Sequence, residues 1–202
     1  MAQWTEGRLG RATGEVLTSE RERQVTDLSA HQLTMTVLMT PETANFAGNV
    51  HGGTILNLLD QVAYACTGRY AGSYVVTLSG DQVIFRQPVH VGELVTFLAS
   101  VNSTGRTSME IGIKVLAEDI RTKEVRHVNS CCFTMVALDG CGEPVTVTPV
   151  RPFSPAEKRR HAAAVRRRRA RQEVEAEDAC DPPSGCGSHG DWNAGQPLAA
   201  EG

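Results

Sequence analysis

Residues 45–60, NFAGNVHGGTILNLLD, join a polar stretch containing three glycines to an apolar run that ends on a carboxylate. An ionised Asp60 within an apolar helix is costly unless it is paired, solvated or protonated. Asp60 and Asn57 could therefore lie on a narrow exposed stripe, or Asp60 could cap a neighbouring element. Alternatively, Asp60 lies at the wall of a cleft and serves as a base or nucleophile. The residues alone leave these interpretations open.

Gly52 and Gly53 indicate what such a carboxylate could act on. They fall at the predicted start of the helix, where unpaired backbone N–H groups and the positive end of the helix dipole can hold an oxyanion. Asp60 lies seven residues further on, about 10 Å along the same helix, which is too far to act on a carbonyl held at Gly53. A second, antiparallel copy of the helix would bring the two groups together, so this chemistry predicts a dimer.

The histidines and cysteines do not indicate a metal site. His51 could be an acid or base, or could simply suit the conformation before the two glycines. Three further histidines show no metal-ligand spacing, and three candidate ligands near the C-terminus fall short of the four that structural zinc prefers. We expect no metal and no cofactor, and we expect the six cysteines to be reduced thiols.

The elements that position these residues follow from the apolar patterns. Residues 32–39 alternate with a period of two and predict a strand, and residues 40–49 form a turn-rich loop. From residue 53 to about 70 the apolar positions recur at helical spacing and fill nearly every face, which predicts a helix buried nearly all round. Strand patterns follow at 73–85, 93–101, 108–119 and 126–139. This order predicts an α+β domain whose antiparallel sheet wraps a central helix.

The flanking segments differ in composition from this body. We predict a flexible N-terminal arm at 1–29, one folded domain at 30–152, a charged helix at 153–178 and a disordered tail at 179–202. Ser154, Pro155 and Glu157 form the start signal of that helix. No apolar stretch is long enough to cross a membrane and no signal peptide precedes the body, so we expect a cytoplasmic protein.

The charged helix raises the alternative of a polyanion-binding protein. Residues 157–171 contain eight Lys and Arg and one Glu, whereas the whole chain has a net charge of −3. Such a helix could bind nucleic acid or an anionic membrane, but its alanines and single valine are too small to anchor in a bilayer. We favour a solvated helix beside an acidic body and expect no nucleic-acid partner. The chain also lacks the nucleophile elbow of serine hydrolases, the P-loop and the dinucleotide fingerprint.

Taken together, three motifs resemble one known family. The stretches PETANFAGNVHGGTILNLLD, FRQPVHVGELVTF and GRTSMEIGIKV occur in this order between His31 and about Val147. They resemble the hotdog-fold acyl-coenzyme A thioesterases, and most closely the hexameric group that includes the brain-type cytosolic acyl-CoA hydrolase and its single-domain bacterial relatives. The resemblance implies hydrolysis of acyl-CoA to a free fatty acid and coenzyme A, by a homo-oligomer whose minimum unit is a dimer and whose expected form is a hexamer.

The resemblance also implies roles for individual residues. Asn45 and Asp60 match the family's active-site amide and carboxylate, which opposite protomers contribute, and the backbone N–H of Gly53 matches the group that polarises the thioester carbonyl. Asp60 would activate water as a general base or attack as a nucleophile. Residues near the substrate or coenzyme A would be His51, Gly52, Ser79, Gly80, Arg106, Thr107 and Ser108.

Other interpretations of these residues remain. Arg106 could be a solvated residue of a turn, and Ser79, Gly80 and Asp81 could form an ordinary strand with a bulge. The enzyme could instead be an aromatic thioesterase of the phenylacetyl-CoA type. It could also be a non-catalytic module that binds acyl-CoA, although such a sensor would not need both Asn45 and Asp60.

Overall fold

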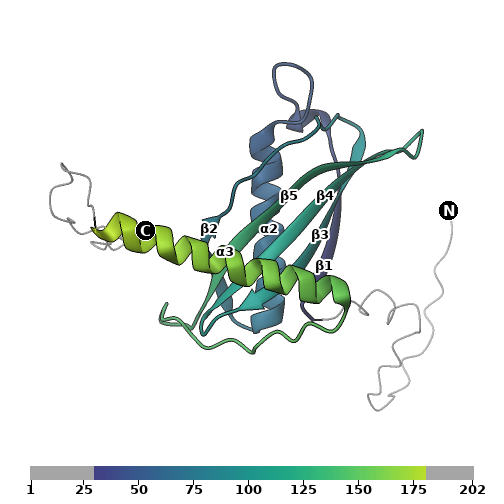
Figure 1. Ribbon diagram of the computed structural model, residues 1–202. Helices are drawn as coiled ribbons and strands as arrows, with labels where there is room; N and C mark the ends of the chain where they lie inside the picture. Colours follow the sequence, from purple (N-terminus) through teal and green to yellow (C-terminus); the bar gives the residue numbers. More distant parts are fainter. Residues whose placement is uncertain (1–29, 181–202) are drawn as a thin grey trace, which may run out of the picture.

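The computed structural model describes residues 30–180, in which one long helix lies behind an antiparallel sheet and a second helix crosses its front (Figure 1). The strands are β1 (Gln32–Leu38), β2 (Tyr74–Gly80), β3 (Glu93–Thr104), β4 (Ser108–Asp119) and β5 (Val125–Leu138). They are ordered β1-β3-β4-β5-β2, and every neighbouring pair is antiparallel. The predicted α+β fold is confirmed. The predicted N-terminal arm, and the tail from residue 181, lie outside the described residues.

The long helix, α2 (Gly52–Ala71), has a capping residue at each end. His51 is the N-cap, and Gly72 ends the helix in the left-handed conformation, with φ of 66°, that glycine adopts without strain. One face of α2 packs on the sheet and forms the core with alternate residues of the strands. Its buried residues are Ile55, Leu59, Val62, Ala63, Cys66 and Thr67.

The prediction that α2 is buried nearly all round is wrong for a single chain. Leu56 and Tyr64 on its outward face are 42% and 47% exposed. The reason is geometric: one sheet covers one side of a helix, and the chain supplies no second layer within the described residues. Leu56 and Tyr64 on the outward face of α2 are therefore not covered by any other part of residues 30–180.

The strand predicted at 73–85 is shorter than expected, because β2 ends at Gly80. Its register against β5 shifts between Thr77 and Ser79, and beyond Gly80 the chain follows β5 through separate contacts. The Arg86 N–H donates to the Val128 carbonyl, and the carbonyl of Ile84 accepts from the side-chain amide of buried Asn129. The Asn129 side chain thus pairs with the Ile84 carbonyl, which a backbone N–H of the neighbouring strand would pair with in a regular sheet.

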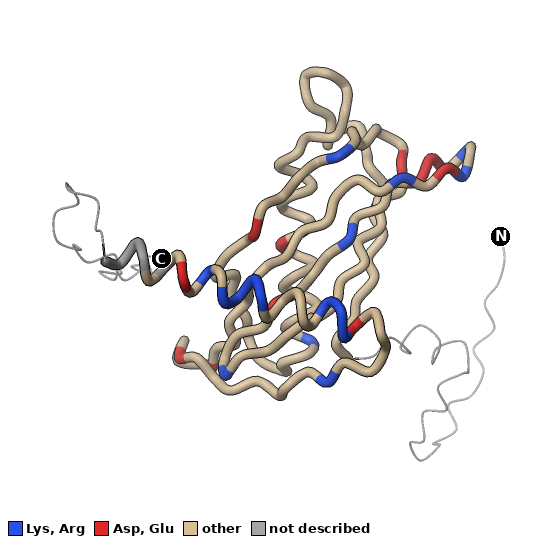
Figure 2. The backbone as a smooth tube through the Cα atoms, in the orientation of Figure 1, with Lys and Arg blue, Asp and Glu red and all other residues tan. Residues whose placement is uncertain are grey.

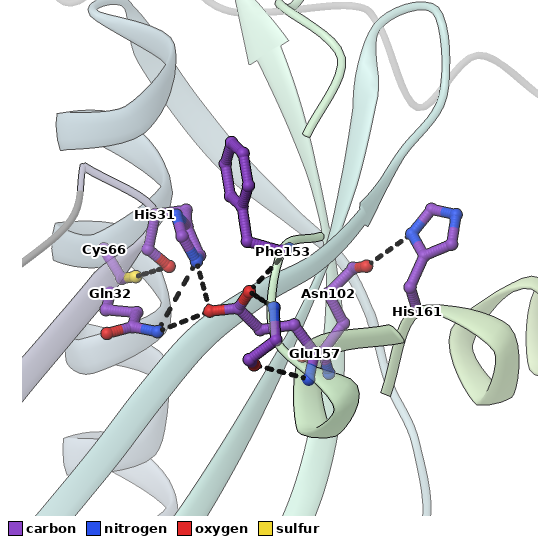
Figure 3. Close-up of polar contacts among 8 residues, drawn as sticks. His31, Gln32, Cys66, Asn102, Phe153, Glu157 and His161 are labelled. Carbon is purple, nitrogen blue, oxygen red and sulfur yellow. Dashed lines mark hydrogen bonds and ion pairs between the residues drawn. The ribbon is translucent and has the colours of Figure 1, made fainter. Parts of the chain in front are cut away.

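The second helix, α3 (Pro155–Cys180), begins at the predicted capping box. The Ser154 hydroxyl accepts from the Glu157 N–H at 3.1 Å, and the Glu157 carboxylate accepts from the N–H groups of Phe153 and Ser154 at 2.8 and 3.0 Å. Figure 3 shows that this carboxylate also meets the side chains of His31 and Gln32, both at 3.3 Å. The start of α3 is thereby tied to the start of β1.

The interpretation of α3 as a solvated helix needs correction, because acidic residues of the sheet hold it. The basic residues gather on α3 where it crosses the sheet (Figure 2). Arg171 pairs with Asp81 at 2.8 Å and with Glu110 at 2.9 Å, and Arg167 pairs with the same Glu110. Glu110 is 4% exposed, and Ala164 of α3 is fully buried. Part of the basic charge is therefore neutralised within the chain.

The Glu157 carboxylate that caps α3 should make the stability of the fold depend on pH. Hydrogen bonds from the Ser154 and Phe153 N–H groups, together with His31, lower the pKa of Glu157 from 4.5 to about 2. Because this pKa is depressed by folding, its stabilisation is complete above about pH 4.5 and is lost as the pH falls toward 2. We expect the difference in unfolding free energy between wild type and Glu157→Gln to be constant above that range and to shrink within it. Urea unfolding at a series of pH values measures this difference, and a difference that stays flat down to pH 2 contradicts the assignment.

Candidate active site

Asn45 lies in the loop that leads into α2, with its side-chain oxygen already engaged. That oxygen accepts from the N–H groups of Ala47 and Asn49 at 2.9 and 3.2 Å, which fixes the amide in an Asx-type turn. The side-chain NH2 group has no partner among residues 30–180 and remains free to donate. Asn45 lines a groove of about 320 Å³ that it shares with Gly52 and Phe85.

The opposite wall of this groove, residues 85–89, is fixed by an ion pair. Arg126 donates to the Gln87 side chain at 3.3 Å and to the Pro88 carbonyl at 3.1 Å. The same guanidinium pairs with Glu93, which is 5% exposed. Because a buried carboxylate without its partner is costly, this contact holds the wall in one position.

The predicted oxyanion donor, the Gly53 N–H at the start of α2, already has a hydrogen-bond acceptor within the chain. The Gly53 N–H donates to Nδ1 of His51 at 2.9 Å. A Cβ on residue 53 would lie 3.0 Å from the same nitrogen, so glycine gives His51 room to approach the backbone. His51 therefore caps the helix, which agrees with the conformational role considered for it. A carbonyl oxygen can reach the Gly53 N–H only by displacing the imidazole or sharing the donor with it.

Asp60 lies two turns further along α2 on the exposed side, next to the sheet edge. The Thr77 hydroxyl of β2 donates to one carboxylate oxygen of Asp60 at 2.6 Å. The other oxygen has no partner among the described residues. Asp60 and Asn57 do share an exposed stripe within one chain, so a cleft around Asp60 requires a second surface.

Thr77 was not among the residues picked from the sequence. Its neighbour on the same face of β2, Val75, is fully buried, and Thr77 contacts the sulfur of Met135 in the core. Thr77 itself is exposed, but the alternation that places it on the same side of the strand as Val75 was the signal available in the sequence.

The remaining predicted residues fall into two groups. Ser79 and Ser108 line a separate pocket of about 140 Å³ on the α3 side of the sheet. Gly80 packs against the ring of Phe133, whereas Arg106 and Thr107 form the turn between β3 and β4. The carbonyls of that turn accept from Val147 and Ala137 at 3.0 and 2.9 Å, and the Arg106 side chain is exposed. The structure thus brings Ser79 and Ser108 together and leaves Arg106 outside the pocket.

Of the cysteines in the described residues, Cys66 and Cys131 are buried, Cys132 is partly buried and Cys141 is exposed. Burial raises the pKa of the thiol to about 11 for Cys66, 12 for Cys131 and 11 for Cys132, so these thiols are protonated at neutral pH and poor nucleophiles. Residues 30–180 contain no group of three or more His, Cys, Asp or Glu side chains arranged to hold a metal ion. In the same residues, no helix is both long and apolar enough to cross a membrane.

Comparison with known proteins places this geometry in a family. The family model of the thioesterase superfamily matches residues 47–124. Protein VdlD of Helicobacter pylori is 51% identical over 140 residues, which cover 69% of this chain and 80% of that protein. The crystal structure of an apo-hexameric acyl-CoA thioesterase is 34% identical, with a TM-score of 0.70 over 72% of this chain and 93% of the other.

A second similar structure adds a pattern of residues. The acyl-CoA hydrolase of Staphylococcus aureus, in complex with butyryl coenzyme A, coenzyme A and coenzyme A disulfide, is 29% identical, with a TM-score of 0.66 over 74% of this chain and 92% of that one. Structures of its alanine variants replace an asparagine, an aspartate fifteen residues later and a threonine seventeen residues after that. Asn45, Asp60 and Thr77 have the same two spacings in this chain.

The family match, the identity over most of the length of these relatives and the shared sheet and helix agree with one another. This chain belongs to the thioesterase superfamily, among the hotdog-fold acyl-CoA thioesterases.

Proposed function

We propose that this chain hydrolyses acyl-CoA at sites shared between two protomers, with Asp60 of one and Asn45 and Gly53 of the other. The observation that carries the proposal is the Thr77 hydroxyl bound to Asp60 at 2.6 Å on an exposed face of α2 that also carries the apolar side chains of Leu56 and Tyr64. The spacing of Asn45, Asp60 and Thr77, shared with the residues replaced in the Staphylococcus aureus enzyme, supports it.

The exposed surface around Asp60 supports the dimer. Leu56 and Tyr64 of α2 are joined by Tyr74 of β2, which is 58% exposed and contacts the ring of Tyr64. The strand β2 is also at the edge of the sheet, with one row of backbone groups unpaired within the described chain. A second copy related by a two-fold axis would cover both features and set the two α2 helices antiparallel. Its Asn45 and Gly53 would then approach Asp60.

The geometry suggests how each group acts. Thr77 holds one oxygen of Asp60, so the other oxygen is left to take a proton from water or to attack the thioester carbon. The partner's Gly53 N–H and the free NH2 of Asn45 would donate to the oxyanion that forms when the carbonyl is attacked. If water attacks, collapse of the tetrahedral species breaks the carbon–sulfur bond, and coenzyme A leaves as its thiol with the proton that Asp60 took from water. If Asp60 attacks, the same bond breaks and leaves a mixed anhydride on Asp60; water then hydrolyses the anhydride, which releases the acid, regenerates the carboxylate and supplies the proton for the thiolate. These steps use water, the substrate and groups from the two protomers.

The wider assembly and location belong to this proposal as well. The hexameric acyl-CoA thioesterase that this chain resembles supports a trimer of such dimers. The cytoplasmic location rests on the sequence prediction, and a cytosolic acyl coenzyme A thioester hydrolase of Rattus norvegicus is 29% identical over 138 residues.

Asp60→Asn tests the carboxylate. The amide keeps the shape and can still meet Thr77, but it can neither accept a proton nor attack, so we expect the kcat to fall about 100-fold or more. Thiol release from short, long and aromatic acyl-CoAs measures it, and the preferred substrate separates fatty from aromatic thioesterases. Gel filtration and circular dichroism confirm that the variant remains folded and assembled. Undiminished hydrolysis by the folded variant would remove Asp60 from the mechanism.

We expect the Thr77 hydroxyl to contribute to the rate of hydrolysis. We expect Thr77→Val, which keeps the shape, to lower the kcat about tenfold because Asp60 loses the hydrogen bond that orients it. Thr77→Ser retains the hydroxyl and should stay close to wild type. Equal rates for Thr77→Val and wild type would show that Asp60 is oriented by other contacts.

The shared site can be tested by complementation. Asn45→Ala and Asp60→Asn should each be nearly inactive alone. When the two are unfolded, mixed in equal amounts and refolded, half the dimers are mixed and each holds one intact site, so about a quarter of wild-type activity should return. A mixture as inactive as its components would place Asn45 and Asp60 of one protomer in the same site.

A further inference from the structure

A hollow on the face of the sheet away from α2 is not used by the proposed chemistry. It lies beside α3 and has a volume of about 510 Å³, within the range of roughly 300–1,000 Å³ typical of small-molecule sites. The sheet forms its floor, and the first half of α3, which crosses the front of the sheet in Figure 1, forms one wall. Within the described chain, none of the residues that line it belongs to α2 or β2, the elements that the proposed dimer covers. We call this hollow the outer cavity.

The register of the strands explains why the sheet is hollow there. Two rows of outward-facing residues run side by side across β1, β3, β4 and β5. The row nearer α3 is Gln32, Ser100, Gly112 and Cys132. The row beyond it is Thr34, Leu98, Lys114 and Ser130. Neighbouring strands lie about 4.8 Å apart, so each row is about 14 Å long. Because three residues of the first row are small, a trough remains between the second row and α3.

Two polar atoms in the outer cavity are buried without a hydrogen bond inside the described chain. Asn102 is 7% exposed and is the extra residue at the point where the register of β3 against β4 shifts. Its Oδ1 has no partner, and a Cβ on residue 112 would collide with its Nδ2, so the glycine there lets the amide lie across the cavity floor. The second atom is Nε of Arg167. Buried polar atoms are normally paired, so an acceptor and a donor left over in one cavity indicate a polar ligand group.

The wall formed by α3 is fixed beside this floor. Nδ1 of His161 donates to the backbone carbonyl of Asn102 at 2.8 Å, as Figure 3 shows. Arg160, Ala163 and Arg167 line the cavity from positions three and four residues apart, so they share one face of the helix. The cavity therefore exists in the folded chain without any movement of α3.

The charge and the apolar surface of the outer cavity indicate the class of ligand. Arg160 and Lys114 have no ion pair within residues 30–180, and no Asp or Glu is among the described residues that line the cavity, so it favours an anion. Leu98, which is 39% exposed, and Ala163 offer aliphatic contacts. The described lining contains no aromatic ring on which a nucleotide base could stack. An anion with an aliphatic chain therefore fits better than a nucleotide.

We propose that the outer cavity binds an aliphatic carboxylate such as a free fatty acid. The chain lies in the trough over Ser100 and Gly112, and the carboxylate accepts hydrogen bonds from Arg160 and from Nε of Arg167. A half-turn of the Asn102 amide presents its NH2 group to the carboxylate as a third donor. Charge-assisted hydrogen bonds from arginine to a carboxylate are short and strong. The proposed reaction would release an acid of this class, but its binding here requires no turnover.

Arg160→Gln tests the cation, with Arg159→Gln as its matched control. Arg159 is the preceding residue on α3, is exposed and does not line the cavity, so both variants lose the same charge from the same turn. In calorimetric titration of the whole chain with dodecanoate, we expect Arg160→Gln to weaken the affinity about tenfold and Arg159→Gln to leave it near wild type. Equal affinities for the two variants would overturn the proposal.

Ser100→Leu fills the trough, with Thr36→Leu as its control. Thr36 lies on the same outward face, beside Thr96 and outside the cavity. We expect Ser100→Leu to abolish the binding of dodecanoate and Thr36→Leu to retain it. In the wild type, dodecanol has the chain without the charge and should bind at least about tenfold more weakly. AMP, an anion with a base in place of the chain, should not compete. Displacement of dodecanoate by AMP, or equal affinity for dodecanol, contradicts the assignment of an aliphatic carboxylate.

The same variants separate the outer cavity from the proposed reaction site and from a contact between copies. A carboxylate held near Asp60 would not respond to Ser100→Leu, so an unchanged affinity for dodecanoate in that variant, shown by circular dichroism to be folded, rejects the cavity as the site. Sedimentation velocity compares its assembly with that of the wild type. Loss of the assembly in Ser100→Leu would identify the cavity as a contact between copies and would also reject ligand binding.

The outcome for the cavity is independent of the outcome for the enzyme. If no thioester is hydrolysed but the expected order of dodecanoate affinities is found, the cavity stands and the enzymatic proposal fails. If thioesters are hydrolysed and neither Arg160→Gln nor Ser100→Leu changes the affinity for dodecanoate, the cavity assignment fails and the enzymatic proposal stands.

Discussion

The packing of α2 on a single sheet is the constraint on which the rest of the structure depends. One sheet buries one face of a twenty-residue helix, and the core forms there from Ile55, Leu59 and Val62 with alternate residues of the strands. The opposite face is left with Leu56, Tyr64 and Asp60 exposed. The same packing that stabilises the domain therefore leaves the carboxylate on a surface that one chain cannot enclose.

The two ends of the proposed chemistry are prepared in different ways. At Asp60, a threonine from the neighbouring strand fixes one oxygen and leaves the other accessible. At the start of α2, the Gly53 N–H donates to Nδ1 of His51. The histidine thus caps, in the free protein, the same donor that the proposed reaction would use.

The strongly basic helix α3 is attached to the domain by ion pairs. Glu110 and Asp81, on different elements of the sheet side, each meet arginines one turn apart on the helix, and Glu157 ties its first turn to β1. Buried charges of this kind contribute little net stability but penalise any other placement of the helix. They define which arginines face the sheet and which face solvent.

The sequence by itself determined the local structure: the helix with its glycine start, the strands with their alternation and the capping box at Ser154 all follow from contacts between residues close in the chain. It also indicated Asp60 as a residue able to do chemistry and, through the family resemblance, Asn45. Only the tertiary structure decided the exposure of one face of α2, the end of β2 at Gly80, the bond between Thr77 and Asp60, and the pairing of Arg167 and Arg171 with the sheet. These features depend on residues 17 to 90 positions apart. Whether a polar side chain is paired or exposed is set by its neighbours in space, which local patterns do not specify.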